Sequence, residues 1–121
     1  MYKIKREVLG AIIEASKNTY PHEFFGVLGG SPGEKIVDEL IVVPATYGRN
    51  FTLIKSHLIP FDSKMIGTVH SHPSYSSRPS KQDIATFGKM GSIHLIIAYP
   101  FNSESFNAFD SKGIKTAIEL I

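Results

Sequence analysis

The sequence predicts a single α/β domain with a mixed β-sheet, an N-terminal helix on one face and a second helix near an end of the sheet. Two observations indicate this fold class. An apolar stripe with helical spacing opens the chain, and short β-branched and aromatic runs separated by tight turns follow it. At 121 residues the chain is long enough for one hydrophobic core and too short for two domains, so we expect residues 1–121 to form one domain.

The first predicted element is an amphipathic helix over about residues 4–17. Ile4, Val8 and Ile12 recur at four-residue steps and form its apolar face. Pro21 closes the region that follows, because proline cannot continue a helix.

A β-hairpin is predicted next, from two β-branched and aromatic runs at residues 24–28 and 35–43. The cluster Gly29-Gly30-Ser31-Pro32-Gly33 between them is typical of a turn. A further apolar run covers residues 51–59.

A short strand and a second helix enclose the most polar part of the sequence. The apolar run at residues 65–69 leads directly into His70-Ser71-His72-Pro73, and a polar loop follows. Ser80 and Asp83 have the spacing of a helix N-cap and its capping-box partner, so they predict a helix start. Gly88 ends that helix early.

Three strand-like runs complete the chain, at residues 92–99, 105–110 and 115–120. The last two are joined by a turn at residues 111–113. Strands joined by such short turns favour a largely antiparallel sheet.

Composition excludes several classes of site and partner. The chain has no cysteine, so a cysteine nucleophile, a cysteine-containing zinc module and a disulfide framework are excluded, and His, Asp and Glu are the strong metal ligands left. A net charge of +2 without a long basic block argues against a nucleic-acid or membrane partner. No apolar run is long enough to span a bilayer and no secretory signal is recognisable, so we expect a cytoplasmic protein.

His70 and His72 form the strongest chemical signal. Both project from one face of a strand, about 6 to 7 Å apart along the chain, so that one metal ion can bridge them. A catalytic zinc site holds three protein ligands and one water, and Asp83, in the first turn of the next helix, suits the third position. The same residues are equally compatible with an ordinary strand and a capping box without a metal.

Two other interpretations are weaker. A Ser-His-Asp hydrolase is disfavoured because no G-x-S-x-G elbow is present and Ser71 lies on the strand face opposite to the histidines. A helix-turn-helix over residues 79–90 is excluded by its continuation, since residues 93–99 read as a strand where a recognition helix is required.

His70-Ser71-His72-Pro73, six residues, Ser80, two residues and Asp83 form a pattern that resembles the JAMM motif of the MPN (Jab1/Mov34) metalloprotease family. Residues 21–30 are similar to the glutamate-bearing segment of that family, P-x-E-x-x-G-x-L-x-G. The resemblance covers nearly the whole chain and is closest in length to compact archaeal members. It departs at Phe25, where many members have cysteine.

The resemblance implies an MPN fold similar to that of the cytidine deaminases, and a zinc-dependent peptidase. It assigns one Zn²⁺, with a water as fourth ligand, to His70, His72 and Asp83. It assigns the general base to Glu23 and assistance at the oxyanion to Ser80. The other histidines, His22, His57 and His94, have no ligand spacing, and we expect them to be surface or ordinary strand residues.

The family's substrate is commonly the C-terminal Gly-Gly tail of a ubiquitin-like β-grasp protein joined to lysine. In the loop after His72, Tyr75 and Arg78 are candidates for contacting that tail, or are simply solvated. The alternatives are C-terminal processing of a sulfur-carrier protein with the same catalytic residues, and a non-catalytic MPN scaffold. An exposed edge strand is compatible with a homodimer, although no residue pattern specifies one.

Overall fold

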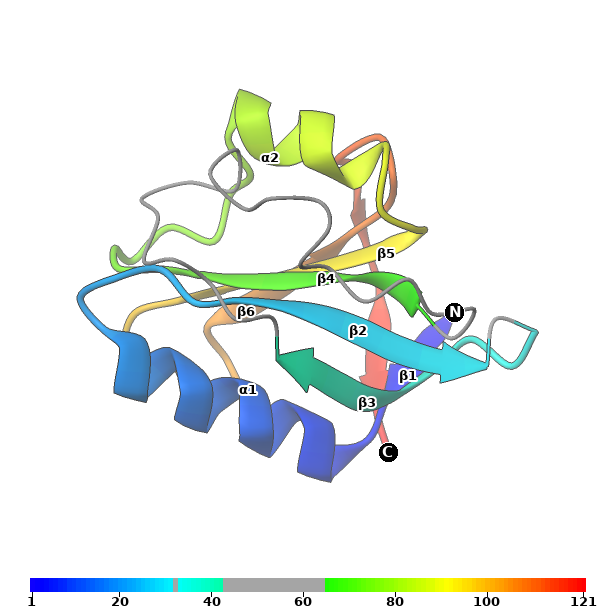
Figure 1. Cartoon of the computed structure of the whole chain (residues 1–121), viewed down its shortest axis with the longest axis horizontal. Helices are drawn as coiled ribbons and strands as arrows, with labels where there is room; N and C mark the ends of the chain where they lie inside the picture. Colours follow the sequence, from blue (N-terminus) through cyan, green and yellow to red (C-terminus); the bar gives the residue numbers. More distant parts are fainter. Residues whose placement is uncertain (32, 43–64) are drawn as a thin grey trace.

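A computed structural model of the protein describes residues 1–31, 33–42 and 65–121, and the apolar run predicted at residues 51–59 lies outside them. The described residues form a mixed sheet with one helix against each face (Figure 1). The helices are α1 (Arg6–Thr19) and α2 (Lys81–Phe87). Within this part of the chain, neither helix has the length and apolar character needed to cross a bilayer.

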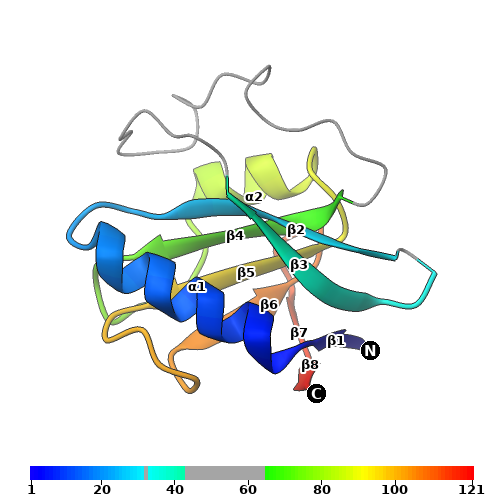
Figure 2. The same ribbon diagram turned by 60° about the horizontal axis from the view of Figure 1, so that its bottom comes forward.

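Within the described residues the sheet has eight strands, in the order β7-β6-β5-β4-β2-β3-β1-β8. Figure 2 shows the sheet from the side of α1. Three neighbouring pairs are parallel, β1 with β3, β1 with β8 and β4 with β5, and the other four are antiparallel. The strands are β1 (Tyr2–Ile4), β2 (Phe25–Ser31), β3 (Ile36–Val42), β4 (Met65–His72), β5 (Ile93–Ala98), β6 (Phe106–Phe109), β7 (Lys115–Thr116) and β8 (Ile118–Leu120). The predicted mixed α/β fold is confirmed.

The N-terminal helix begins later than its apolar spacing predicts. Ile4 belongs to β1, where it lies beside Val37 of β3 and Leu120 of β8, and the helix starts at Arg6 and runs on to Thr19. Ile4 is fully buried and packs in the main core with the apolar face of α1. The prediction placed Ile4 in the helix because both a helix and this strand direct it into the same core.

The predicted hairpin is present, but Gly29 and Gly30 lie in β2, and Gly33 is the glycine of the predicted cluster that lies in the turn. β2 pairs antiparallel with β3 and continues to Ser31, and the turn lies beyond, where the Glu34 N–H donates to the Ser31 carbonyl. A Cβ added at Gly30 would lie 2.0 Å from the carbonyl oxygen of Ile36. The glycine is therefore needed for close strand approach.

The last predicted strand, at residues 115–120, divides into two that lie at opposite edges of the sheet. Thr116 of β7 pairs with Ala108 of β6, whereas Ile118 of β8 pairs with Tyr2 of β1. Two consecutive short strands therefore join the two edges, so the sheet closes toward a barrel. Both halves of the run at residues 115–120 have the same local strand propensity, so only their pairing with other strands distinguishes β7 from β8.

Strand β5 runs through the centre of the molecule and is buried along its whole length. Leu95 and Ile97 pack in the core cluster that includes α1, and Ile96 packs with Phe87 of α2. β5 is thus buried on both faces, by the core cluster that includes α1 on one and by Phe87 of α2 on the other. This explains why all its residues except His94 are apolar.

A buried histidine on β5 anchors the second helix. The His94 ring stacks on Phe87 with ring centroids 4.3 Å apart. Its Nδ1 lies 2.7 Å from the Thr68 hydroxyl, and its Nε2 lies 3.0 Å from the Gly91 carbonyl, which accepts a hydrogen bond from it. Burial lowers the pKa of His94 to about 4, against the opposing effect of its carbonyl partners Gly91 and Phe87. His94 is thus a neutral strand histidine, as predicted.

We expect Gly67→Ala to destabilise the fold strongly. A Cβ at Gly67 would lie 1.5 Å from the carbonyl oxygen of Ile93 on the paired strand β5, so β4 and β5 must separate, at a cost of more than about 2 kcal/mol. Gly10→Ala is the control, because Gly10 is exposed on α1 with open space around it, and alanine there is worth up to about 1 kcal/mol of added stability. Urea denaturation measures both. Equal midpoints for the two variants would contradict the packing described here.

The neutral state of His94 predicts a pH-dependent stability. Between pH 6.5, its ordinary pKa, and about 4, the unfolded chain binds a proton that the folded chain does not, so stability falls as the pH falls. From pH 7.5 to pH 5 the loss assigned to this group is about 2 kcal/mol. Urea titrations with chelator, at both pH values, should show a smaller loss for His94→Gln than for the unaltered protein. The same loss in both proteins would contradict this assignment.

Candidate metal centre

The two histidines of the motif lie at the end of β4 and converge on one point. Their Nε2 atoms are 3.0 Å apart and their ring centroids 4.8 Å apart. His70 is fully buried and His72 is partly exposed. The alternation of the strand therefore places both rings on one face, as predicted, and this is the face that α2 covers (Figure 1).

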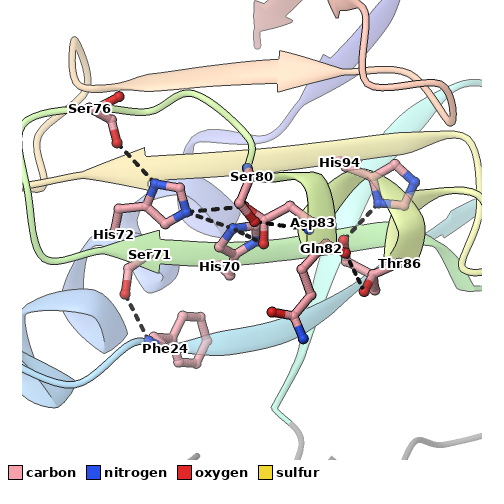
Figure 3. Close-up of polar contacts among 11 residues, drawn as sticks. Phe24, His70, Ser71, His72, Ser76, Ser80, Gln82, Asp83, Thr86 and His94 are labelled. Carbon is pink, nitrogen blue, oxygen red and sulfur yellow. Dashed lines mark hydrogen bonds and ion pairs between the residues drawn. The ribbon is translucent and has the colours of Figure 1, made fainter. Parts of the chain in front are cut away.

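Asp83 reaches the histidines from the first turn of α2 (Figure 3). Its carboxylate oxygens lie 3.3 Å from His70 Nε2 and 3.4 Å from His72 Nε2. One ligand atom from each of the three residues lies within 4.8 Å of the others, so they can hold one metal ion. Asp83 is nevertheless buried, with 6% of its surface exposed.

The predicted capping box is present and fixes the same carboxylate. The Ser80 N–H donates to Asp83 Oδ2 at 2.8 Å, and the Asp83 N–H donates to Ser80 Oγ at 3.1 Å. The cap and the metal interpretation are therefore compatible, since one carboxylate serves both. The Ser80 hydroxyl proton is not used by the cap and can be donated to a third group.

The electrostatics of the three residues depend on one another. Burial raises the pKa of Asp83, but hydrogen bonds from His70 and His72 outweigh it and hold that pKa well below its usual range. Burial lowers the pKa of His70, and the Asp83 carboxylate opposes this only in part. His70 therefore keeps a neutral ring, with a nitrogen lone pair available to a metal.

A backbone carbonyl orients the second histidine. His72 Nδ1 donates to the Ser76 carbonyl at 2.9 Å, so in the neutral ring Nε2 carries the lone pair that faces the cluster. Burial lowers the pKa of His72, but the Asp83 carboxylate and the Ser76 carbonyl raise it above the ordinary value. The sequence offers no sign of this contact, because any residue can supply a carbonyl. It is an orienting bond of the kind that metal-binding histidines use.

Glu23 is 47 residues from His70 in the chain, yet it is near enough to the cluster to interact electrostatically with His72 and Asp83. It immediately precedes Phe24 and β2, and β2 pairs with β4 so that Phe25 lies opposite His70. The carboxyl group is partly buried. Burial raises the pKa of Glu23, the His72 ring lowers it, and the Asp83 charge raises it. A partly desolvated carboxylate within the field of both residues is a candidate proton acceptor.

The loop after β4 carries the two residues predicted to contact a substrate. Tyr75 is 82% exposed, and its ring packs edge-on against Tyr99 at 5.4 Å. Arg78 is exposed, and its N–H donates to the Ser76 hydroxyl at 3.3 Å. Both flank the carbonyl that orients His72. Contact with a substrate stays a prediction for both.

Ser71 is buried and its hydroxyl accepts a hydrogen bond from the Phe24 N–H. This agrees with the prediction that Ser71 is not a nucleophile. Of the remaining histidines, His22 is exposed and His57 lies outside the described residues.

The donor set fits zinc. Two imidazole nitrogens and one carboxylate converge on a partly buried point, which is the ligand type of catalytic zinc sites, and one ring is held by a second hydrogen bond as such sites require. Calcium and magnesium prefer all-oxygen ligands and suit this cluster poorly.

We expect Asp83→Asn to lose zinc while it keeps a folded helix. Asparagine retains an oxygen that can accept the Ser80 N–H, but it removes the charged ligand. Ser80→Ala is the matched control, since it removes the cap hydroxyl, at about 1 kcal/mol of stability, and keeps the three ligand side chains. Elemental analysis after dialysis should give close to one zinc per chain for the unaltered protein and for Ser80→Ala, and far less for Asp83→Asn. Full occupancy in Asp83→Asn would remove Asp83 from the ligand set.

Comparison with known proteins identifies the family. The model of the prokaryotic homologs of the JAB domain matches residues 5–111. A protein of Haloferax volcanii named a probable metalloprotease is 32% identical in an alignment of length 119 that covers 91% of this chain and 73% of that protein.

Two solved structures are also similar along the whole chain. One, described as JAMM, a metalloprotease-like zinc site in the proteasome and signalosome, is 36% identical with a TM-score of 0.80, covering 100% of this chain and 98% of the other. A JAB1/MPN domain protein from Archaeoglobus fulgidus is 36% identical with a TM-score of 0.77, covering 100% and 97%. With the JAMM residues of the sequence gathered in one cluster, the chain belongs to the prokaryotic JAB domain family and is a zinc metalloprotease of the JAMM type.

Proposed function

We propose that the protein hydrolyses the peptide or isopeptide bond that follows the C-terminal Gly-Gly of a ubiquitin-like modifier protein. The observation that carries the proposal is the partly buried Glu23 carboxyl group beside a cluster of two histidines and an aspartate. A proton acceptor next to a zinc site is the arrangement that amide hydrolysis by water requires.

His70, His72 and Asp83 would hold the metal. Bound zinc supplies Lewis acidity toward the substrate carbonyl and lowers the pKa of water toward about 7. Because the burial of His70 favours its neutral ring, the ligand is ready for the metal without loss of a proton at neutral pH.

Glu23 carries the proton in this mechanism. Its carboxylate accepts a proton from the attacking water as the oxygen adds to the substrate carbonyl. It then donates that proton to the amine nitrogen as the carbon–nitrogen bond breaks, since an amine leaves poorly until it is protonated. The raised pKa of Glu23 suits it to both steps, because a group titrating nearer neutrality can accept and return a proton.

Ser80 assists at the oxyanion. Its Oγ already accepts the Asp83 N–H, so its hydroxyl proton is available to the negative charge that develops on the carbonyl oxygen. Ser80 is exposed, which leaves it accessible to a substrate. Loss of one such donor typically lowers turnover by about 100-fold or more.

The proposed substrate is the one that the resemblance to the JAMM family implies, and the surroundings of the site support it. An extended tail can add to a sheet edge through main-chain hydrogen bonds, and glycines pass where a side chain would not. The exposed Tyr75 and Arg78 of the loop beside His72 are our candidates for contact with that tail. A non-catalytic scaffold is disfavoured, because Glu23 and the three metal-site residues are all retained.

The proposal is tested with two substrates followed by intact mass spectrometry. One is a small β-grasp modifier joined through its terminal glycine to a lysine ε-amine, and the other is the same modifier extended by a C-terminal cysteine or short peptide. Cleavage of the first supports a modifier-removing isopeptidase. Preferential trimming of the second would favour processing of a sulfur-carrier protein, and cleavage of neither would contradict the proposal for this modifier.

We expect Glu23→Gln to abolish cleavage and keep zinc. Glutamine has nearly the same shape and cannot accept the proton, so turnover should fall by about 100- to 10,000-fold, with zinc content unchanged. Glu14→Gln is the matched control, because Glu14 is exposed on α1, across the sheet from the cluster. Activity within twofold of normal in Glu23→Gln would remove Glu23 from the mechanism.

A further inference from the structure

Ser71 lies between two proposed metal ligands and has no part in the mechanism above. The side chain is buried, with 1% exposed surface, and it lies on the opposite side of β4 from the histidines. Its hydroxyl oxygen accepts the Phe24 N–H at 2.8 Å (Figure 3). Its own N–H donates to the Phe24 carbonyl at 2.9 Å. Both backbone groups of Phe24 are therefore bound to this one residue.

Phe24 is the residue directly after Glu23. Its side chain is 7% exposed and packs in the main core cluster with Val8 and Leu9 of α1. The next residue, Phe25, already lies in the β2–β4 ladder opposite His70. The backbone that carries Glu23 is thus anchored on one side by core packing and on the other by Ser71.

The hydroxyl replaces a backbone acceptor at this point. The β2–β4 ladder begins at Phe25, and the Phe24 N–H lies just before it. Without an oxygen at position 71, this buried N–H loses its acceptor and the segment must shift to find another. A shift there moves Glu23, because only one peptide unit separates the two residues.

We propose that Ser71 is a positioning residue for Glu23. Its hydroxyl fixes the Phe24 backbone and so keeps the Glu23 carboxylate within the field of His72 and Asp83. The inference rests on the proposed role of Glu23 as proton acceptor. A displacement of about 1 Å at such a group is enough to lower a rate by about 100-fold.

The test compares two variants, Ser71→Thr and Ser71→Val. Threonine keeps the hydroxyl, and valine has nearly the shape of threonine but lacks the hydroxyl. On the modifier–lysine substrate we expect Ser71→Val to lower kcat by about 10- to 100-fold, with KM within threefold and zinc content unchanged. Ser71→Thr should restore kcat to within about threefold. Ser16→Ala is the matched control, since Ser16 is also buried and its hydroxyl bonds a backbone carbonyl, that of Ile12, on α1.

A double-variant cycle separates positioning from general damage. In the Glu23→Gln background, Ser71→Val should lower the residual rate by less than about twofold, because the group on which Ser71 acts is already gone. Effects that multiply would overturn the inference. So would a loss of zinc from Ser71→Val that accounts for its loss of activity, since Ser71 would then serve the histidines.

A measurement without substrate makes the two proposals distinguishable. In the cobalt(II)-loaded protein, the paramagnetic shift of the Glu23 side chain reports its place relative to the metal. We expect this paramagnetic shift to change in Ser71→Val and to keep its unaltered value in Ser71→Thr and Ser16→Ala. An unchanged shift in Ser71→Val overturns the inference. If the unaltered protein cleaves neither substrate, the proposed function fails, and this shift still decides whether Ser71 positions Glu23.

Discussion

The candidate centre depends on the register between β2 and β4, in which Phe25 lies opposite His70. This pairing brings Glu23, which precedes β2, to the histidines at the far end of β4. A shift by one residue would turn Glu23 or the histidines to the other face of the sheet. On the other side of β2, Gly30 allows close approach to the Ile36 carbonyl of β3.

The second constraint is the position of the short helix α2. Its first turn carries Asp83 over the histidines, and the Phe87 ring at its other end stacks on His94 of β5. The Ser80–Asp83 capping box and the cluster share one carboxylate, so the same side chain holds the start of the helix and contributes to the centre. A seven-residue helix has little stability of its own, and these contacts from both ends explain why it forms here.

Most errors in the predicted elements concern strand pairing. The split of residues 115–120 into β7 and β8 depends on partners that lie 116 residues away in the chain for β8 and six to eight residues away for β7. Ile4 likewise satisfies a helical stripe and a buried strand equally well. In each case the local sequence pattern predicted correctly that the side chain is buried, but it did not predict which neighbouring element buries it. A helix and a strand can direct the same side chain into the core.

The sequence by itself determined the α/β class, the histidine pair on one strand face, the capping box and, through these motifs, the family. Those features depend on local periodicity and on the chemistry of a few side chains. Three interactions were decided by the tertiary structure alone. They are the electrostatic interaction of Glu23 with His72, the hydrogen bond from His72 to the Ser76 carbonyl and the hydrogen bond from the Phe24 N–H to the Ser71 hydroxyl. These contacts join distant segments or use backbone atoms that every residue possesses. They therefore follow from packing and strand register, and the local sequence pattern does not predict them.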